Sequence, residues 1–143
     1  MEGVNPQDVK KFLQQYRSAL HEAKAALDHL TELRAMAERI TPVYGGSGGG
    51  AHEDDKLGAA VARIIDMENR VSDRIEHLEA ADRAVTKAID AVDDETQRTV
   101  LYERYINGKT FEKIAVEMSY CWRQTIRIHG AALQAVGEAM QKG

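Results

Sequence analysis

The sequence is poor in the residues that build β-sandwiches, disulfide frameworks and membrane spans. Only two of its 143 residues are proline and 6% are aromatic, which argues against a β-sandwich. The single cysteine, Cys121, excludes an internal disulfide framework. No run of about eighteen apolar residues occurs, and the first residues lack the basic and apolar regions of a signal peptide. We therefore expect a cytoplasmic protein without a membrane-spanning segment.

The patterns of common catalytic and cofactor sites are also missing. A single thiol cannot build a typical zinc site, and the glycine-rich tract 45–50 lacks the GxxxxGK[ST] and GxGxxG spacings that hold phosphates. The histidines are scattered and form no HExxH motif: His21, His29, His52, His77 and His129. We expect no catalytic residue, no metal and no cofactor, and hence a protein that is not an enzyme.

The charge is unevenly distributed along the chain. The formal net charge is −4. Residues 1–92 carry 12 basic and 16 acidic residues, whereas residues 93–143 carry 7 of each. A neutral C-terminal part predicts modest, salt-sensitive binding to a polyanion such as DNA, for which several copies per site would be needed.

Two long helices are predicted in the first 92 residues. Asn5 is a good cap and Pro6 fits a first helical turn, so one helix begins there and runs to about residue 41. A flexible glycine-rich loop, 43–52, precedes a second helix over about 53–92. Both helices carry apolar residues at alternating steps of three and four, the period of a coiled-coil seam. On the first helix this stripe comprises Leu13, Tyr16, Leu20, Ala23, Leu27, Leu30 and Ala37.

Neither long helix can bury its stripe alone. The helices must pair with each other as an antiparallel hairpin, with copies in other chains, or both. Glu68 and Asp82 interrupt the second stripe, and we expect them at its edge or paired with a base such as Arg34. Residues 1–92 are therefore interpreted as an oligomerisation domain, with contacts from Leu20, Leu27, Val61, Ile64, Val71, Ile75 and Leu78.

Residues 93–143 show the pattern of three helices. The first, over 93–106, is capped by Asp93 or Asp94 and ends at Gly108, because glycine takes the left-handed conformation that closes a helix.

Thr110 then caps a short helix that ends at residue 118, and a three-residue turn leads into a last helix from Trp122. This order is typical of a helix-turn-helix, whose second helix enters a DNA major groove. The predicted fold class is all-α: a long antiparallel helical hairpin or coiled coil, followed by a C-terminal three-helix helix-turn-helix domain over 93–143.

The last two helices have an inward and an outward side. Thr125, Ile128, Ala132 and Leu133 recur at core spacing. His129 is assigned to the outside with the polar residues. Arginine and glutamine side chains are suited to base edges and phosphates. The candidate DNA-binding residues are Lys109, Thr110, Lys113, Trp122, Arg123, Gln124, Ile126 and Arg127.

Three short motifs in this part resemble region four of bacterial sigma factors. They are VLYERY (100–105), GKTFEKIA (108–115) and AAL (131–133). The family has the patterns VL-x-x-RY and G-x-T-x-x-E-I-A, and a recognition helix that ends in K-A-L. The arrangement of the whole chain is similar to that of small sigma-like proteins of phages and prophages from Gram-positive bacteria, such as the ArpU-like late-transcription regulators.

The resemblance implies that Thr110 caps a helix, that Ala115 is a small packing residue, and that the outward residues from Trp122 to Arg127 face DNA. Among the departures from the family, Ser119 replaces the usual turn glycine, Cys121 the usual serine cap and Ala131 the usual lysine. No segment resembles region two, which melts promoters, so a complete sigma factor is not expected.

The sequence thus favours a phage- or prophage-type transcription regulator that binds double-stranded DNA in the cytoplasm of a bacterial host and forms homo-oligomers through its long helices. Two alternatives remain open. One is a DNA-packaging adaptor that forms a ring, like a terminase small subunit. The other is an interaction protein that binds RNA polymerase through residues such as Trp122 and Ile126.

Overall fold

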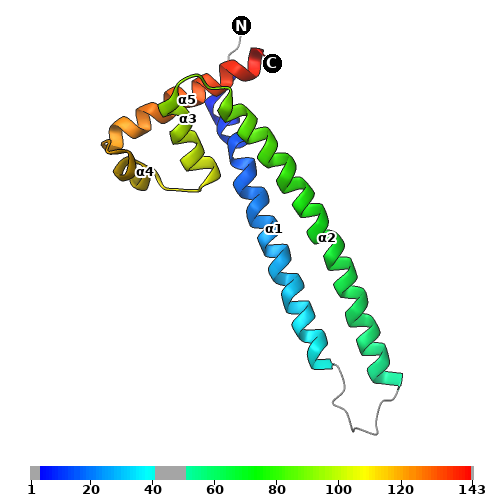
Figure 1. Cartoon of the computed structure of the whole chain (residues 1–143). Helices are drawn as coiled ribbons and strands as arrows, with labels where there is room; N and C mark the ends of the chain where they lie inside the picture. Colours follow the sequence, from blue (N-terminus) through cyan, green and yellow to red (C-terminus); the bar gives the residue numbers. More distant parts are fainter. Residues whose placement is uncertain (1–3, 41–50, 143) are drawn as a thin grey trace. The chain divides into compact units, whose positions relative to one another are not determined.

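The computed structural model describes residues 4–40 and 51–142, and these are helical apart from short connections. The elements, shown in Figure 1, are α1 (Pro6–Ile40), α2 (Ala51–Asp90), α3 (Glu95–Leu101), the π-helical turn η1 (Tyr102–Ile106), α4 (Phe111–Met118) and α5 (Trp122–Lys142). No strand occurs within these residues, so the predicted all-α class is confirmed. Most of the expected loop 43–52 and the side chain of His52 lie outside the described part of the chain. In the described ranges, no helix combines the length and the hydropathy that crossing a membrane requires.

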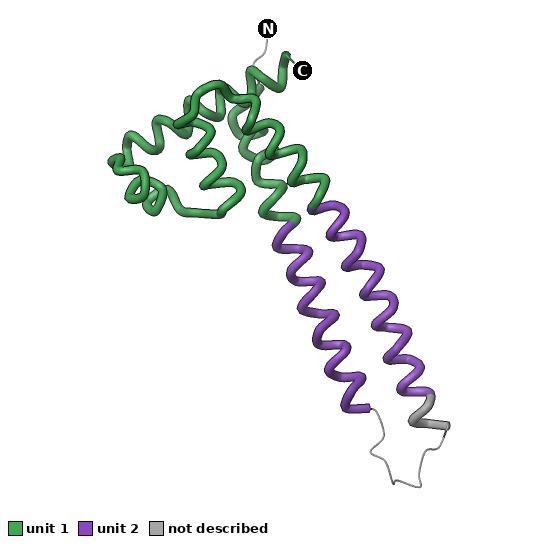
Figure 2. Tube along the Cα trace, viewed as in Figure 1, with its two compact units in different colours: residues 1–19, 79–143 green, residues 20–78 purple. Residues whose placement is uncertain are grey.

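The chain forms two compact units, drawn in different colours in Figure 2. Unit 1 comprises residues 1–19 and 79–143, and unit 2 comprises Leu20–Leu78. The first turns of α1 and the last turns of α2 therefore group with the C-terminal helices. This division differs from the sequence-based expectation, which placed all of both long helices in residues 1–92.

Unit 2 is an antiparallel pair of helices from one chain. Two ion pairs show the direction: Glu22 Oε2 lies 4.0 Å from Arg74 Nη1, and Arg34 Nη2 lies 2.8 Å from Glu68 Oε2. From the first ion pair to the second, the residue number rises on α1 and falls on α2. The core between the helices consists of Leu30, Leu33, Met67 and Val71, with Ala26 and Ile64 packed against it.

The seam of unit 2 agrees with the predicted stripe at Leu30, Ile64 and Val71 and differs from it at other positions. The expected seam residues Leu27, Val61 and Ile75 are 49%, 44% and 42% exposed. Ala26, next to Leu27, packs against the core on α1, and Met67, next to Glu68, lies in the core on α2. The predicted and the observed seams both alternate in steps of three and four, so periodicity alone does not choose between them. The expectation that Glu68 pairs with Arg34 is confirmed.

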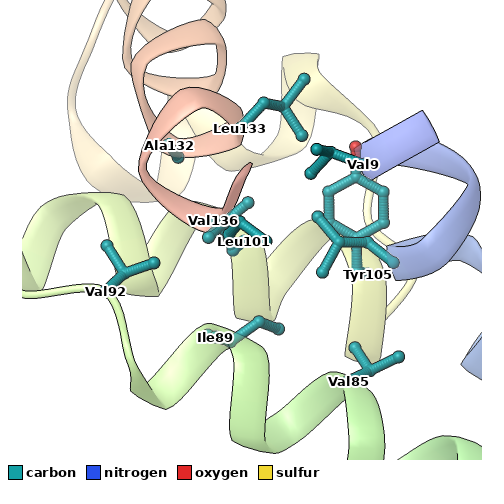
Figure 3. Close-up of a cluster of buried hydrophobic side chains, with 10 residues drawn as sticks. Val9, Val85, Ile89, Val92, Leu101, Tyr105, Ala132, Leu133 and Val136 are labelled. Carbon is teal, nitrogen blue, oxygen red and sulfur yellow. The ribbon is translucent and has the colours of Figure 1, made fainter. Parts of the chain in front are cut away.

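The core of unit 1 draws side chains from several helices. Val9 and Leu13 of α1 pack with Val85 and Ile89 of α2, and residues of α3, η1 and α5 complete the cluster (Figure 3). Leu13, Leu101 and Val136 are each 0% exposed. Burial of such a side chain stabilises the folded state by about 1.5–3 kcal/mol. The full cluster is Val9, Leu13, Val85, Ile89, Val92, Leu101, Tyr105, Ala132, Leu133 and Val136.

The helix expected over 93–106 is present in two parts. Asp94 caps it, since its carboxylate accepts a hydrogen bond from the Gln97 backbone N–H at 2.9 Å. The α-helical part ends at Leu101, and the chain continues as η1, where the Asn107 N–H donates to the Tyr102 carbonyl at 3.1 Å. A π-turn fits an extra residue into the helix and so shifts the face that later side chains occupy. Sequence periodicity gave no sign of this turn.

Candidate nucleic-acid interface

Two capped helices and a three-residue connection form the outer part of unit 1. The Thr110 hydroxyl accepts a hydrogen bond from the Lys113 N–H at 3.2 Å and so caps α4. Cys121 Sγ accepts a hydrogen bond from the Gln124 N–H at 3.4 Å at the start of α5. Thiol sulfur is a weak acceptor, so this cap is weaker than the serine cap of the family that the sequence resembles.

Ser119 lies at the end of α4 in a left-handed conformation, with φ of 60° and ψ of 38°. It is the single non-glycine residue with positive φ in the described ranges. The neighbouring Tyr120 N–H donates to the Ala115 carbonyl at 2.9 Å, so the α4 terminus is closed in spite of the serine. Because a side chain is disfavoured in this conformation, the residue stores strain where glycine would store little.

Three polar side chains lie exposed on the first turns of α5: Arg123, Gln124 and Arg127. Residues three and four apart share one face of a helix, so Arg127 is next to both Arg123 and Gln124. Neither arginine forms an ion pair or a side-chain hydrogen bond with another described residue. Both guanidinium groups are therefore available to an external anion.

The inward side of α5 agrees with the sequence prediction at Thr125, Ala132 and Leu133, which are buried. His129 does not agree, because it is 5% exposed, and its assignment to the outside was wrong. Its ring lies against Phe111 in an edge arrangement at 4.7 Å between centroids. The reason is that position 129 follows Thr125 by one turn and so lies on the same inward face.

His129 and Tyr105 form a polar pair within this core. Tyr105 Oη and His129 Nε2 are 2.7 Å apart, and the rings are stacked at 5.7 Å. Burial lowers the pKa of His129 to about 4, with smaller contributions from the charges of Lys10 and Arg104. Burial also raises the pKa of Tyr105 to about 12. The pair is therefore uncharged at neutral pH, and it joins η1 to α5 without bringing a charge into the core.

Lys109, a candidate DNA contact, is engaged inside the protein. Its ammonium group pairs with the Glu103 carboxylate and lies 2.6 Å from Glu117 Oε2. The hydrogen bond to Lys109 lowers the pKa of Glu103, and the two carboxylates raise the pKa of Lys109. The cluster carries two negative charges and one positive charge, so it adds nothing to the attraction of a polyanion.

The remaining candidates lie at the surface to different extents. Thr110 and Lys113 at the start of α4 are exposed, and Ile126 is half-buried. Trp122 is 54% exposed. On α4, Val116 is 79% exposed, although the sequence gave it no role. An apolar side chain at a solvent-facing helix position is a signal that helical periodicity could have revealed.

The turn before α4 is held by α1. Arg17 Nη1 donates to the Ile106 carbonyl at 3.2 Å. Gly108 has φ of +72°, and a Cβ atom there would lie 2.5 Å from Arg17 Cζ. The glycine is favoured by its backbone conformation, and a Cβ atom there would require the Arg17 guanidinium to move. The predicted helix stop at this residue is thus also a packing site.

The candidate oligomerisation residues do not form one continuous surface. Val71 is buried in the core of unit 2, and Ile64 packs against this core. Leu20 and Leu78 are half-buried, whereas Leu27, Val61 and Ile75 are largely exposed.

No group of three or more histidine, cysteine, aspartate or glutamate side chains that could hold a metal ion occurs within 4–40 and 55–142.

Comparison with known proteins gave no match, whether to a protein-family model, to a curated protein or to a solved structure.

Proposed function

We propose that this protein is a DNA-binding transcription regulator of phage or prophage type, in which α5 enters the major groove of double-stranded DNA and the long helices mediate homo-oligomerisation. The observation that carries this proposal is the outward face of α5, where the side chains of Arg123, Gln124 and Arg127 lie exposed and make no hydrogen bond or ion pair with another described residue. Arginine reads guanine and glutamine reads adenine in the major groove, and each good bidentate contact contributes about 1–3 kcal/mol of discrimination.

The arrangement around this face supports a role in recognition. A helix that reads bases must be held rigidly, and α5 is fixed by the buried Thr125, His129 and Ala132 on its inward side. The exposed Lys113 at the start of α4 is suited to a phosphate contact.

The small number of available cations sets the expected strength of binding. Because Lys109 is paired with two carboxylates, the exposed cations of α4 and α5 before residue 130 are Lys113, Arg123 and Arg127. Each neutralised phosphate contributes about −0.9 to the slope of log K against log salt, so one chain gives a slope of about −3. A single chain then binds weakly, and two or more copies on one site are needed for specific occupancy.

Fluorescence polarisation with a pool of random-sequence duplexes, followed by selection, tests the proposal. The double variant Arg123→Ala/Arg127→Ala should weaken binding at least tenfold and reduce the salt slope by about 2 per chain. The matched control, Arg63→Ala/Arg70→Ala, removes two exposed arginines from α2 and should leave binding nearly unchanged. Salt-independent binding, or no binding to any duplex at low ionic strength, would contradict the proposal.

A second candidate function is favoured by the exposed Val116 and Trp122. Apolar side chains at the surface of a small helical domain suit a protein partner, and RNA polymerase is the partner that the sigma-like resemblance suggests. Co-purification with RNA polymerase separates the two candidates. Loss of binding in Val116→Ser/Trp122→Ala, with retention in Arg123→Ala/Arg127→Ala, would favour this second function.

A further inference from the structure

Unit 2 carries a set of large apolar side chains that its own two helices leave exposed. Leu27 on α1 and Val61, Ile65 and Ile75 on α2 are 49%, 44%, 51% and 42% exposed. Isolated exposed apolar residues are common, but several on one side of a narrow element indicate a contact surface.

The Arg34–Glu68 ion pair shows that these residues share one flank of the hairpin. The two charged groups are 2.8 Å apart, so positions 34 and 68 face the same side. Leu27 precedes Arg34 by seven residues and Ile75 follows Glu68 by seven, which is about two helical turns. Because the helices are antiparallel, Leu27 and Ile75 lie opposite each other, two turns from the ion pair.

Val61 precedes Glu68 by the same seven residues, and Ile65 lies between them on α2. We call this surface, made of Leu27, Arg34, Val61, Ile65, Glu68 and Ile75, the apolar flank. An ion pair lies at its centre, with apolar residues on either side along the hairpin.

The opposite flank is polar. His29, Arg63 and Arg70 each come directly before a residue of the hairpin core. Arg34 and Glu68 each come directly after one, so the two sets lie on opposite sides of the hairpin. The first three residues, together with Asp66, line a shallow depression on that side. The exposed apolar residues Leu27, Val61, Ile65 and Ile75 therefore lie on the side away from this depression.

We propose that the apolar flank binds the same flank of a second copy of this chain, with the two-fold axis parallel to the helices. In this arrangement α1 of each copy faces α2 of the other, and the product is a four-helix bundle. Leu27 then meets Ile75 of the partner, and Arg34 meets Glu68 of the partner at the same level. The four charged groups alternate in sign around the bundle, which is the complementarity that an isologous interface requires.

The size of the flank fits a modest dimer. The helices of unit 2 are about 30 Å long within the unit and together about 20 Å wide. Such a face covers on the order of 600 Å² per copy, so the dimer buries about 1,200 Å², the lower limit for stable association. The proposal rests on the oligomerisation part of the function proposed above and does not depend on DNA binding.

Light scattering coupled to size exclusion tests the surface. Because the interface is small, the measurement is made at a high chain concentration of about 100 µM. Under these conditions we expect the full chain to have twice its monomer mass of 15.9 kDa. The variant Leu27→Glu/Ile75→Glu should have the monomer mass with an unchanged helical circular dichroism spectrum. The control Met36→Glu/Asn69→Glu adds the same charge at exposed positions outside the flank and should remain dimeric.

A charge exchange tests the register and separates contacts within a chain from contacts between chains. Arg34→Glu alone and Glu68→Arg alone each place four like charges in the homodimer, and both should be monomeric. In their equimolar mixture each contact between chains pairs opposite charges, while the like charges lie within each chain, so the two variants should form a heterodimer. A change in the stability of either variant on its own could not cause the two variants to associate on mixing.

The dimer proposal is overturned if the wild-type chain is monomeric or forms a ring of eight to twelve copies, if Leu27→Glu/Ile75→Glu leaves the mass unchanged, or if the two single-charge variants do not associate. Arg123→Ala/Arg127→Ala should still dimerise. A dimer that binds no DNA would contradict the regulator and leave this interface intact.

Discussion

Unit 1 and unit 2 contain parts of the same two long helices, but they bury apolar side chains to different degrees. In unit 1, α3 and α5 add to α1 and α2, and Leu13, Leu101 and Val136 are fully buried. In unit 2 only two helices are present, and Leu27 and Ile75 remain more than 40% exposed. Two helices in contact can cover only one stripe of each other, whereas further helices close the core from other sides.

This difference indicates what each unit depends on. Unit 1 has a closed core, so its stability depends on the fit of individual side chains. Unit 2 has a narrow core and an exposed flank, so its stability depends on the length of the hairpin and on any partner that covers the flank. The single tryptophan, Trp122, lies in unit 1. Its fluorescence therefore reports unfolding of unit 1, while circular dichroism reports both units.

The largest expected effect is that of a cavity in the closed core. Leu101→Ala should reduce the free energy of unfolding by about 3–5 kcal/mol, since Leu101 is 0% exposed and has no room to relax. Leu27→Ala in unit 2 should cost less than about 1 kcal/mol in the monomer, because this side chain is already half in water. Urea titrations followed by Trp122 fluorescence and circular dichroism measure both. Equal costs at the two sites would remove the distinction between the cores.

Acid should weaken unit 1 through His129. The pKa of His129 is about 4 in the folded state and about 6.5 in the unfolded chain, so the unfolded state binds the proton more tightly. This contribution to stability is therefore present above pH 6.5 and is lost as the pH falls towards 4, by about 3 kcal/mol in total. The loss should be seen in the fluorescence of Trp122.

The control for this acid effect is His129→Gln, which keeps a hydrogen-bonding group beside Tyr105 but cannot take up the proton. The difference between wild type and His129→Gln should grow between pH 6.5 and 4. A wild-type profile parallel to that of His129→Gln would show that the histidine is not the cause.

Two glycines, one in each unit, should respond to alanine with opposite signs. Gly108→Ala places a Cβ atom 2.5 Å from Arg17 Cζ at a φ of +72°, and we expect a loss of about 1–3 kcal/mol. Gly58 in α2 has open space around it, so Gly58→Ala should add up to about 1 kcal/mol through helix propensity. Thermal unfolding shows whether each variant is less or more stable than the wild type. A stabilised Gly108→Ala would show that neither the φ angle nor the arginine constrains this turn.

The smallest expected effect is a gain at the α4–α5 connection. Ser119→Gly should stabilise unit 1 by about 0.5–1 kcal/mol, because the left-handed conformation at φ of 60° is strained for serine. The transition reported by Trp122 should shift to higher urea concentration. Ser119→Ala keeps the Cβ atom and serves as the control, in which no gain is expected.

Much of the local structure could be predicted because helix ends are encoded by short-range chemistry. Asn5, Asp94 and Thr110 each accept a hydrogen bond from a backbone N–H two or three residues ahead, and Cys121 takes the same role with its sulfur. Such bonds require only a suitable side chain and a few residues of chain. The left-handed conformation at Gly108 follows from the same local reasoning.

The candidate site was less predictable, because the state of each charged or polar side chain depends on distant neighbours. Lys109 looked like a free cation, but folding brings Glu103 and Glu117 to its ammonium group. His129 looked like a surface residue, but Tyr105 and Phe111 enclose it. These partners are between 6 and 24 residues away in the sequence, and helical periodicity says nothing about them.

The amino-acid sequence by itself determined that the chain is helical, which residues cap several of its helices, and that apolar residues recur with a three-four period. The tertiary structure decided which of two adjacent registers forms the seam of the hairpin, so that Ala26 is covered and Leu27 is exposed. It also decided that α1 and α2 divide between two compact units. The physical reason is that capping acts over a few residues of one chain segment, whereas burial depends on where a second segment lies, and the three-four spacing of one helix is compatible with more than one seam.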